Sequence, residues 1–88
     1  MTPLYRIEIS PKAKRDLRKI PNTDFEKIDR AIMALEQNPR PFGVKKLQDK
    51  VHRVRMGNWR IIYAIDDSEK WISIVGVKRR SEKTYRTF

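Results

Sequence analysis

The segment HRVRMGNWRIIY, residues 52–63, constrains the fold of this chain more than any other. Two stretches of alternating polar and apolar character flank Gly57-Asn58, a dipeptide typical of the two-residue turn of a β-hairpin. Opposed side chains in a hairpin share one face of the sheet, and side chains alternate along each strand. The predicted pairs are Met56 with Trp59, Arg55 with Arg60, Val54 with Ile61 and Arg53 with Ile62. One face therefore carries Arg53, Arg55 and Arg60, and the other carries Val54, Met56, Trp59, Ile61 and Tyr63.

The three arginines on one predicted face indicate a binding function. Like charges side by side on a sheet repel one another, so a chain that keeps Arg53, Arg55 and Arg60 together has a use for them. Arginine stays protonated at any working pH and binds phosphate through a planar fork of donors. We therefore predict a phosphate-binding site on this face.

The net charge of the chain indicates a polyanionic partner. The sequence has 21 Lys and Arg against 11 Asp and Glu, a formal net charge of +10, and residues 45–88 carry +7 of it. Such an uneven excess is typical of a nucleic-acid-binding surface, and charge alone fits a generally basic, solvated surface equally well. A membrane partner is less favoured, because the basic residues lie on predicted strands rather than along an amphipathic helix.

Length and composition limit the class of protein further. The 88 residues suit one domain spanning residues 1–88. The absence of cysteine excludes disulfides and cysteine-based metal sites, and a single histidine argues against a zinc site. No apolar run approaches the length needed to cross a bilayer. We expect a cytoplasmic protein that binds no metal, no cofactor and no membrane.

The order of the predicted elements gives the fold class. An alternating strand covers residues 4–9, Ser10 and Pro11 begin a first helix, and a capping box from Thr23 to Glu26 begins a second. Residues 38–49 are expected to form a connecting loop, and an apolar strand over residues 71–77 follows the hairpin. The prediction is an α+β fold in the order β-α-α-β-β-β, with a short C-terminal helix or tail. Its two N-terminal helices pack on one face of a small, largely antiparallel four-stranded sheet.

Candidate functional residues outside the arginine cluster lie in the tail. The sequence has no glycine-rich phosphate loop, no paired-carboxylate signature and no cluster of metal ligands. His52 falls by alternation on the face of Val54, so we predict a structural role for it. Tyr85, beyond the basic run from Lys78 to Arg80, can stack on an unpaired RNA base. A solvated basic tail with Tyr85 packed on the domain is an equal alternative.

Three segments resemble the RelE branch of the RelE/ParE toxin superfamily. They are LQDK followed by HRVR (residues 47–50 and 52–55), WRIIY (residues 59–63) and VKRRSEKTYR (residues 77–86), and the resemblance covers nearly the whole chain. RelE toxins are small bacterial ribonucleases that enter the ribosomal A site and cut mRNA. The resemblance thus implies a toxin of a type II toxin–antitoxin system that acts as a metal-independent endoribonuclease. The ribosome, mRNA and a cognate antitoxin are the implied partners.

The resemblance also implies roles for individual residues. RelE enzymes use a ribose 2′-hydroxyl to attack the adjacent phosphate, which leaves a 2′,3′-cyclic phosphate. By position, Arg60 matches the arginine that stabilises the transition state, and Arg79 matches the one assigned to protonation of the leaving group, with Arg80 as the alternative. Tyr85 matches the tyrosine that stacks on the mRNA. The remaining catalytic matches are Arg53 and Arg55, and the implied substrate-binding residues are Lys50, Lys78, Arg80 and Arg86.

Arg55 departs from the pattern of the better-known RelE enzymes. They have a lysine at this position that is suited to deprotonating the 2′-hydroxyl, and the pKa of an arginine scarcely shifts toward neutrality. The resemblance therefore supports transition-state stabilisation more firmly than general-base catalysis: either Arg55 acts purely electrostatically, or the reaction is slower than in the better-known enzymes.

Two other functions fit the same fold. The first is inhibition of DNA gyrase, as by ParE proteins, although these generally lack the full basic and tyrosine set. The second is a non-catalytic basic module that binds RNA or a partner. In each case the charge predicts that an acidic or amphipathic antitoxin segment covers Arg53, Arg55 and Arg60, in a complex that weakens as salt rises.

Overall fold

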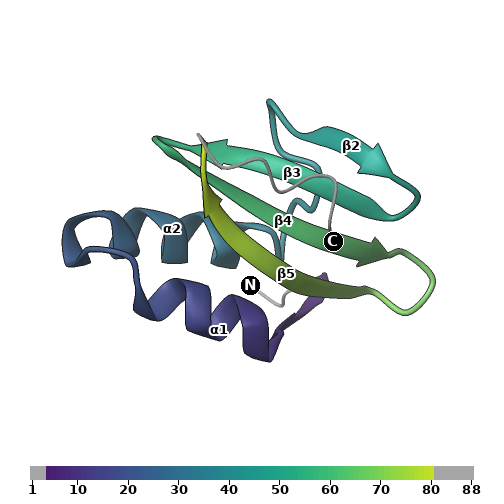
Figure 1. The fold of residues 1–88 in the computed structure, drawn as a ribbon. Coiled ribbons are helices and arrows are strands. Elements are labelled where there is room, and N and C mark those ends of the chain that lie inside the picture. Colours follow the sequence, from purple (N-terminus) through teal and green to yellow (C-terminus); the bar gives the residue numbers. More distant parts are fainter. Residues whose placement is uncertain (1–3, 81–88) are drawn as a thin grey trace.

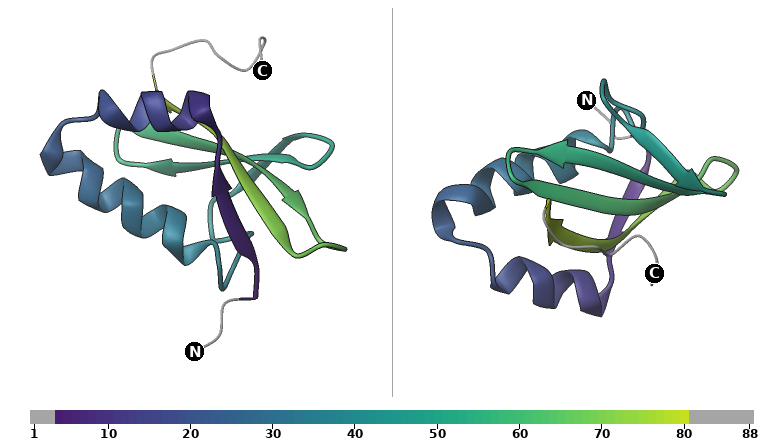
Figure 2. Two further views of the ribbon diagram at one scale, coloured as in Figure 1. Left: turned by 90° about the horizontal axis from the view of Figure 1, so that it is seen from below. Right: turned by 45° about the horizontal axis from the view of Figure 1, so that its top comes forward.

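A computed structural model describes residues 4–80 as two helices and a five-stranded sheet (Figure 1). The elements are β1 (Arg6–Ile9), α1 (Pro11–Arg18), α2 (Asn22–Ala34), β2 (Lys45–Gln48), β3 (Val51–Met56), β4 (Trp59–Asp66) and β5 (Trp71–Arg79). The strand order is β1-β5-β4-β3-β2, in which β1 and β5 are parallel and the other pairs antiparallel. Both helices lie on the same side of the sheet, as the further views in Figure 2 show. The predicted α+β class is confirmed.

The predicted strand count of four is one too few. Residues 45–48, which the sequence assigned to a loop, form β2 and pair with β3 through Lys45 opposite Arg53 and Lys46 opposite His52. The sequence KKLQ has a single apolar residue, so it lacks the alternation that marks a half-buried strand. An edge strand needs only one partner, and charged side chains such as lysine are common there.

Of the two predicted helix N-caps, the structure confirms one and contradicts the other. The side chain of Ser10 accepts a hydrogen bond from the Ala13 N–H (3.0 Å), so the predicted cap of α1 is confirmed. The predicted capping box of α2 is wrong: the N-cap residue is Pro21, and among the described residues no side chain caps this helix. Strand β5 extends through Arg79, two residues further than predicted. The predicted C-terminal helix lies in residues 81–88, outside the described residues.

The core lies between the sheet and the helices. Side chains of β4 and β5 pack against the buried faces of the helices. The fully buried ones include Ile61, Tyr63, Ile72 and Ile74 from the sheet and Ala13, Ile28, Ile32 and Leu35 from the helices and the residue after α2. The hairpin register agrees with the predicted pairs throughout, from Met56 opposite Trp59 to Arg53 opposite Ile62. The predicted arginine face is therefore the face of the sheet away from the helices. Within residues 4–80, neither helix is long and apolar enough to cross a membrane.

Candidate nucleic-acid interface

A tight turn and regular pairing place the first row of cations. Gly57 has φ +61°, in the left-handed region that favours glycine, so the turn forms without steric cost. Arg55 on β3 lies opposite Arg60 on β4, and Arg60 lies opposite Lys78 on β5. The three side chains thus form a row across neighbouring strands, which are about 4.8 Å apart.

A second row runs beside the first, two residues further from the turn, at the next pair on the same face. It consists of Lys45 on β2, Arg53 on β3, Ile62 on β4 and Gly76 on β5. Arg53 is 7% exposed, whereas Arg55 is exposed and Arg60 is half-buried. We call these two rows the basic face; its cations are Lys45, Arg53, Arg55, Arg60 and Lys78. Lys45 was not among the predicted site residues, because it lies on the strand that the sequence did not reveal.

The end of the hairpin forms a hollow that the tail arginines enter. Asn58, Arg60, Arg79 and Arg80 line a volume of about 420 Å³. The N–H of Arg80 donates to the Asn58 carbonyl (2.8 Å), so the chain still follows β4 one residue past β5. The structure therefore brings both candidate tail arginines next to Arg60.

Arg79 and Arg80 reach this hollow from different sides. Arg79 lies opposite Trp59, and its guanidinium stacks over the Trp59 ring, 4.8 Å from the centroid. The indole N–H of Trp59 in turn donates to a carboxylate oxygen of Asp24 on α2 (3.0 Å). Arg79 is thus held toward the helices, whereas alternation places Arg80 on the side of Lys78 and Arg60.

Three predicted site residues are not placed in this cluster. Lys50 precedes β3 at the end remote from the hairpin turn, about 16 Å along the strand from Arg55 at roughly 3.3 Å per residue. Its amine lies 4.0 Å from an Asp66 carboxylate oxygen. Tyr85 and Arg86 lie outside the described residues.

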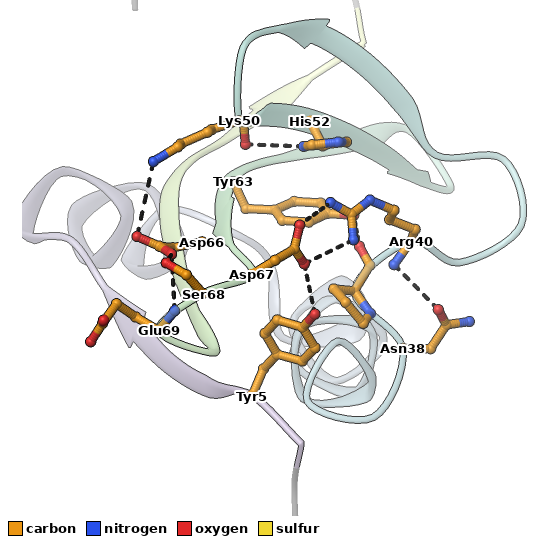
Figure 3. Close-up of polar contacts among 11 residues, drawn as sticks. Tyr5, Asn38, Arg40, Lys50, His52, Tyr63, Asp66, Asp67, Ser68 and Glu69 are labelled. Atoms are coloured by element: carbon orange, nitrogen blue, oxygen red, sulfur yellow. Dashed lines mark hydrogen bonds and ion pairs between the residues drawn. The ribbon is translucent and has the colours of Figure 1, made fainter.

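His52 belongs to the structural core, as alternation predicted. It is 6% exposed, its Nδ1 lies 3.0 Å from the Lys50 carbonyl, and its ring stacks on Tyr63 with centroids 6.0 Å apart (Figure 3). The Tyr63 hydroxyl donates to the Pro39 carbonyl (2.7 Å), and burial raises the pKa of Tyr63 to about 12. The hydroxyl therefore stays protonated and anchors the residues that lead from α2 toward β2. Among residues 4–80, no group of three or more His, Asp or Glu side chains could hold a metal ion.

A polar network of Tyr5, Arg40 and Asp67 connects three segments that lie outside the strands (Figure 3). The guanidinium of Arg40 donates to both carboxylate oxygens of Asp67 (3.2 and 2.8 Å), and the Tyr5 hydroxyl donates to Oδ1 of Asp67 (2.7 Å). Arg40 and Asp67 are 27 residues apart, so no short-range sequence pattern reveals their pairing. The network joins the segment before β1, the segment before β2 and the turn before β5.

The network predicts a dependence of stability on pH. The hydrogen bonds from Arg40 and then Tyr5 lower the pKa of Asp67 to about 2, below the ordinary aspartate range near 4. The stabilisation is therefore present above a pH of about 4 and is lost as the pH falls toward 2. We expect Asp67→Asn to lower the melting temperature at pH 7 and the gap to the wild type to close in that window. Asp29→Asn, at an exposed position of α2, is the control; equal curves for both variants would contradict the prediction.

Comparisons with known proteins all find toxins of toxin–antitoxin systems. The model of the ParE toxin family of type II toxin–antitoxin systems matches residues 7–84. The RelE toxin of Mycobacterium tuberculosis is 34% identical over 84 residues, 88% of this chain and 82% of that protein. The RelE1 protein of Methanocaldococcus jannaschii is 32% identical over 86% of this chain and 90% of its own length. In the crystal structure of the archaeal RelE–RelB complex from Pyrococcus horikoshii, one chain superposes with a TM-score of 0.81 and 28% identity, covering 90% of this chain and 98% of that one.

Proposed function

We propose that this chain, which belongs to the RelE/ParE superfamily of type II toxins and is of the RelE type, is an enzyme. The proposed activity is that of a ribosome-dependent mRNA endonuclease. It cleaves mRNA in the ribosomal A site by attack of a ribose 2′-hydroxyl on the adjacent phosphate. The observation that carries this proposal is the basic face, where Arg55, Arg60 and Lys78 stand side by side on three strands.

The reaction forms a bond from the 2′-oxygen to phosphorus and breaks the bond to the 5′-oxygen, while the 2′-hydroxyl gives its proton to solvent and the 5′-oxygen gains one. The charge that develops in between suits guanidinium groups. Attack by the 2′-oxygen gathers negative charge on the phosphate oxygens, and preorganised guanidinium groups stabilise such charge. Arg60, at the centre of its row, is the group we assign to the transition state, with Arg53 and Arg55 beside it. The guanidinium groups thereby take the charge-stabilising role that a metal ion has in other nucleases.

The other assigned residues bind and orient the RNA. Of the two arginines that line the hollow with Arg60, we assign Arg79 to the leaving 5′-oxygen, with Arg80 as the alternative because Arg79 also stacks on Trp59 toward the helices. Lys78 binds the backbone phosphates, and so does Arg80 if it does not act on the leaving group. Tyr85 stacks on a base and Arg86 binds the strand beyond it. Lys50 lies at the end of β3 remote from the hairpin turn, so it binds RNA or the ribosome at a distance from the reacting phosphate.

A cognate antitoxin is the proposed partner that controls this activity in the cytoplasm. The structural relatives include a RelE–RelB complex, and the basic face is a surface that an acidic segment complements. We expect the dissociation constant of the toxin–antitoxin complex to rise at least tenfold between low and high salt, because salt screens exposed charges. Titration calorimetry at several salt concentrations measures it. A salt-independent constant would place the antitoxin on an apolar surface instead.

The name of the matched family model favours one second candidate, inhibition of DNA gyrase. That activity leaves mRNA intact and accumulates cleaved DNA. Relaxation and cleavage of supercoiled plasmid by purified gyrase, with and without the protein, separate the two functions.

Ribosomes stalled with a defined codon in the A site test the proposed function. We expect a single cut in that codon, with a 2′,3′-cyclic phosphate on the upstream fragment, and no cut in the same mRNA without ribosomes. A message with 2′-deoxyribose at the attacking nucleotide should resist cleavage. Cleavage of the deoxy message would overturn the mechanism, and the absence of any cut would overturn the function.

A further inference from the structure

Helix α1 brings a lysine and an aspartate to the edge of the basic face. Strand β1 ends at Ile9, and α1 then runs beside the last part of β5. There the carboxylate of Asp16, only 12% exposed, accepts the Val77 N–H at Oδ2 (3.0 Å). The Lys78 amine lies 3.4 Å from Oδ1, and the Lys12 amine lies 3.5 Å from Oδ2. Two lysine amines therefore meet at one carboxylate at the edge of the sheet.

Gly76 provides the space through which Lys12 reaches the basic face. Gly76 lies opposite Ile62, which lies opposite Arg53, so a side chain at position 76 would point to the basic face. A Cβ built there would be 3.5 Å from the Lys12 amine and 3.4 Å from Oδ2 of Asp16. The Lys12 amine thus lies in contact with the Cβ position, where a side chain longer than alanine would meet it. The second row then runs from Lys45 through Arg53, Ile62 and Gly76 to Lys12.

We propose that Lys12 is a further RNA-binding residue and that it extends the basic face across Gly76, so that the RNA strand crosses the β-strands toward α1. This inference rests on the proposed function, whose substrate it places along the second row. The row has cations at both ends, Lys45 and Arg53 on one side and Lys12 on the other, which is the arrangement that successive phosphates of one strand need.

The local electrostatics support a phosphate ligand at this position. The Lys78 amine is the main cause that lowers the pKa of Lys12, desolvation is the second, and Asp16 acts in the opposite direction. A bound phosphate would relieve the repulsion between the two amines. The Lys12 side chain is 51% exposed, so it can turn from Asp16 toward such a ligand, whereas Asp16 stays bonded to the Val77 N–H. An oxyanion already lies between the two amines, which is the kind of group that we propose they bind.

Salt-dependent binding of a short single-stranded RNA tests the proposal. The probe is methylated at every 2′-hydroxyl and cannot be cleaved by 2′-attack. We expect Lys12→Gln to weaken binding several-fold at low salt and to lower the slope of log K against log salt by about 0.7–1. Lys14→Gln removes the same charge from an exposed position of α1 and should leave the slope near that of the wild type.

A steric variant tests the same path without a change of charge. Gly76→Val adds a Cβ 3.5 Å from the Lys12 amine and two methyl groups beyond it that crowd the amine, and we expect a similar loss of slope. Melting temperatures of all variants check that they fold. If Gly76→Val does not fold, the inference is judged on the Lys12→Gln slope alone. Equal slopes for Lys12→Gln and Lys14→Gln would overturn the inference. Cleavage of ribosome-bound mRNA by the wild type, measured in parallel, shows whether the proposed function survives that result.

Discussion

Arg60→Ala is expected to lower the rate of mRNA cleavage on ribosomes by a factor of about 10²–10³. Arg60 is the central member of a row in which Arg55 and Lys78 are its neighbours on either side. It also borders the hollow that Arg79 and Arg80 line. Among residues 4–80, Arg60 thus belongs both to the row and to the lining of the hollow, so its loss removes the centre of the proposed charge stabilisation.

The matched variants separate the guanidinium from charge alone. Arg60→Lys keeps the charge and loses the planar fork, so we expect an intermediate rate. Arg15→Ala removes an arginine from an exposed position of α1 and should cleave as fast as the wild type. Single-turnover rates at saturating toxin measure all three. An Arg60→Ala protein that cleaves at the wild-type rate would remove Arg60 from the mechanism.

Ile61→Ala is expected to destabilise the protein by about 2–5 kcal/mol. Ile61 neighbours Arg60 in β4 but points to the helices, where its side chain is 0% exposed and lies in the core cluster. Truncation removes buried methyl groups and leaves a cavity that the rigid strand pairing cannot close. For a domain of this size such a loss is a large part of the whole stability.

The conservative change sets the scale for this prediction. Ile61→Val removes one methyl group and should cost about 0.5–1.5 kcal/mol. Urea unfolding followed by circular dichroism measures both variants. If Ile61→Ala lowers the free energy of unfolding by less than about 1 kcal/mol, Ile61 does not pack in the core as described. Together with Arg60→Ala, this variant separates the two faces of one strand, because one change affects catalysis and the other affects folding.

The hairpin was predictable because its signals are local. A Gly57-Asn58 turn and strict alternation on both sides determine the register, so the pairing of Arg55 with Arg60 followed from the sequence. Strand β2 had no such signal, and with it Lys45 was missed. The capping box failed for a different reason: the chain enters α2 directly after Pro21, two residues earlier than Thr23 and Glu26 indicate.

The contacts that complete the candidate site are long-range, and local patterns do not contain them. Asp16 and Val77 are 61 residues apart, and Asp24 and Trp59 are 35 apart, yet these pairs position Lys12, Lys78 and Arg79. The side on which Arg79 lies depends on the length of β5, which continues through two residues that read as a basic tail. The sequence alone could therefore group the hairpin arginines but could not relate the tail to them.

Mapping of mRNA 5′ ends in a translating extract tests the central claim most directly. With the wild-type protein we predict new 5′ ends within A-site codons, only on messages that ribosomes have engaged, and none with Arg60→Ala. Equal cleavage of naked RNA, or intact mRNA in an extract where the protein still arrests synthesis, would contradict the account.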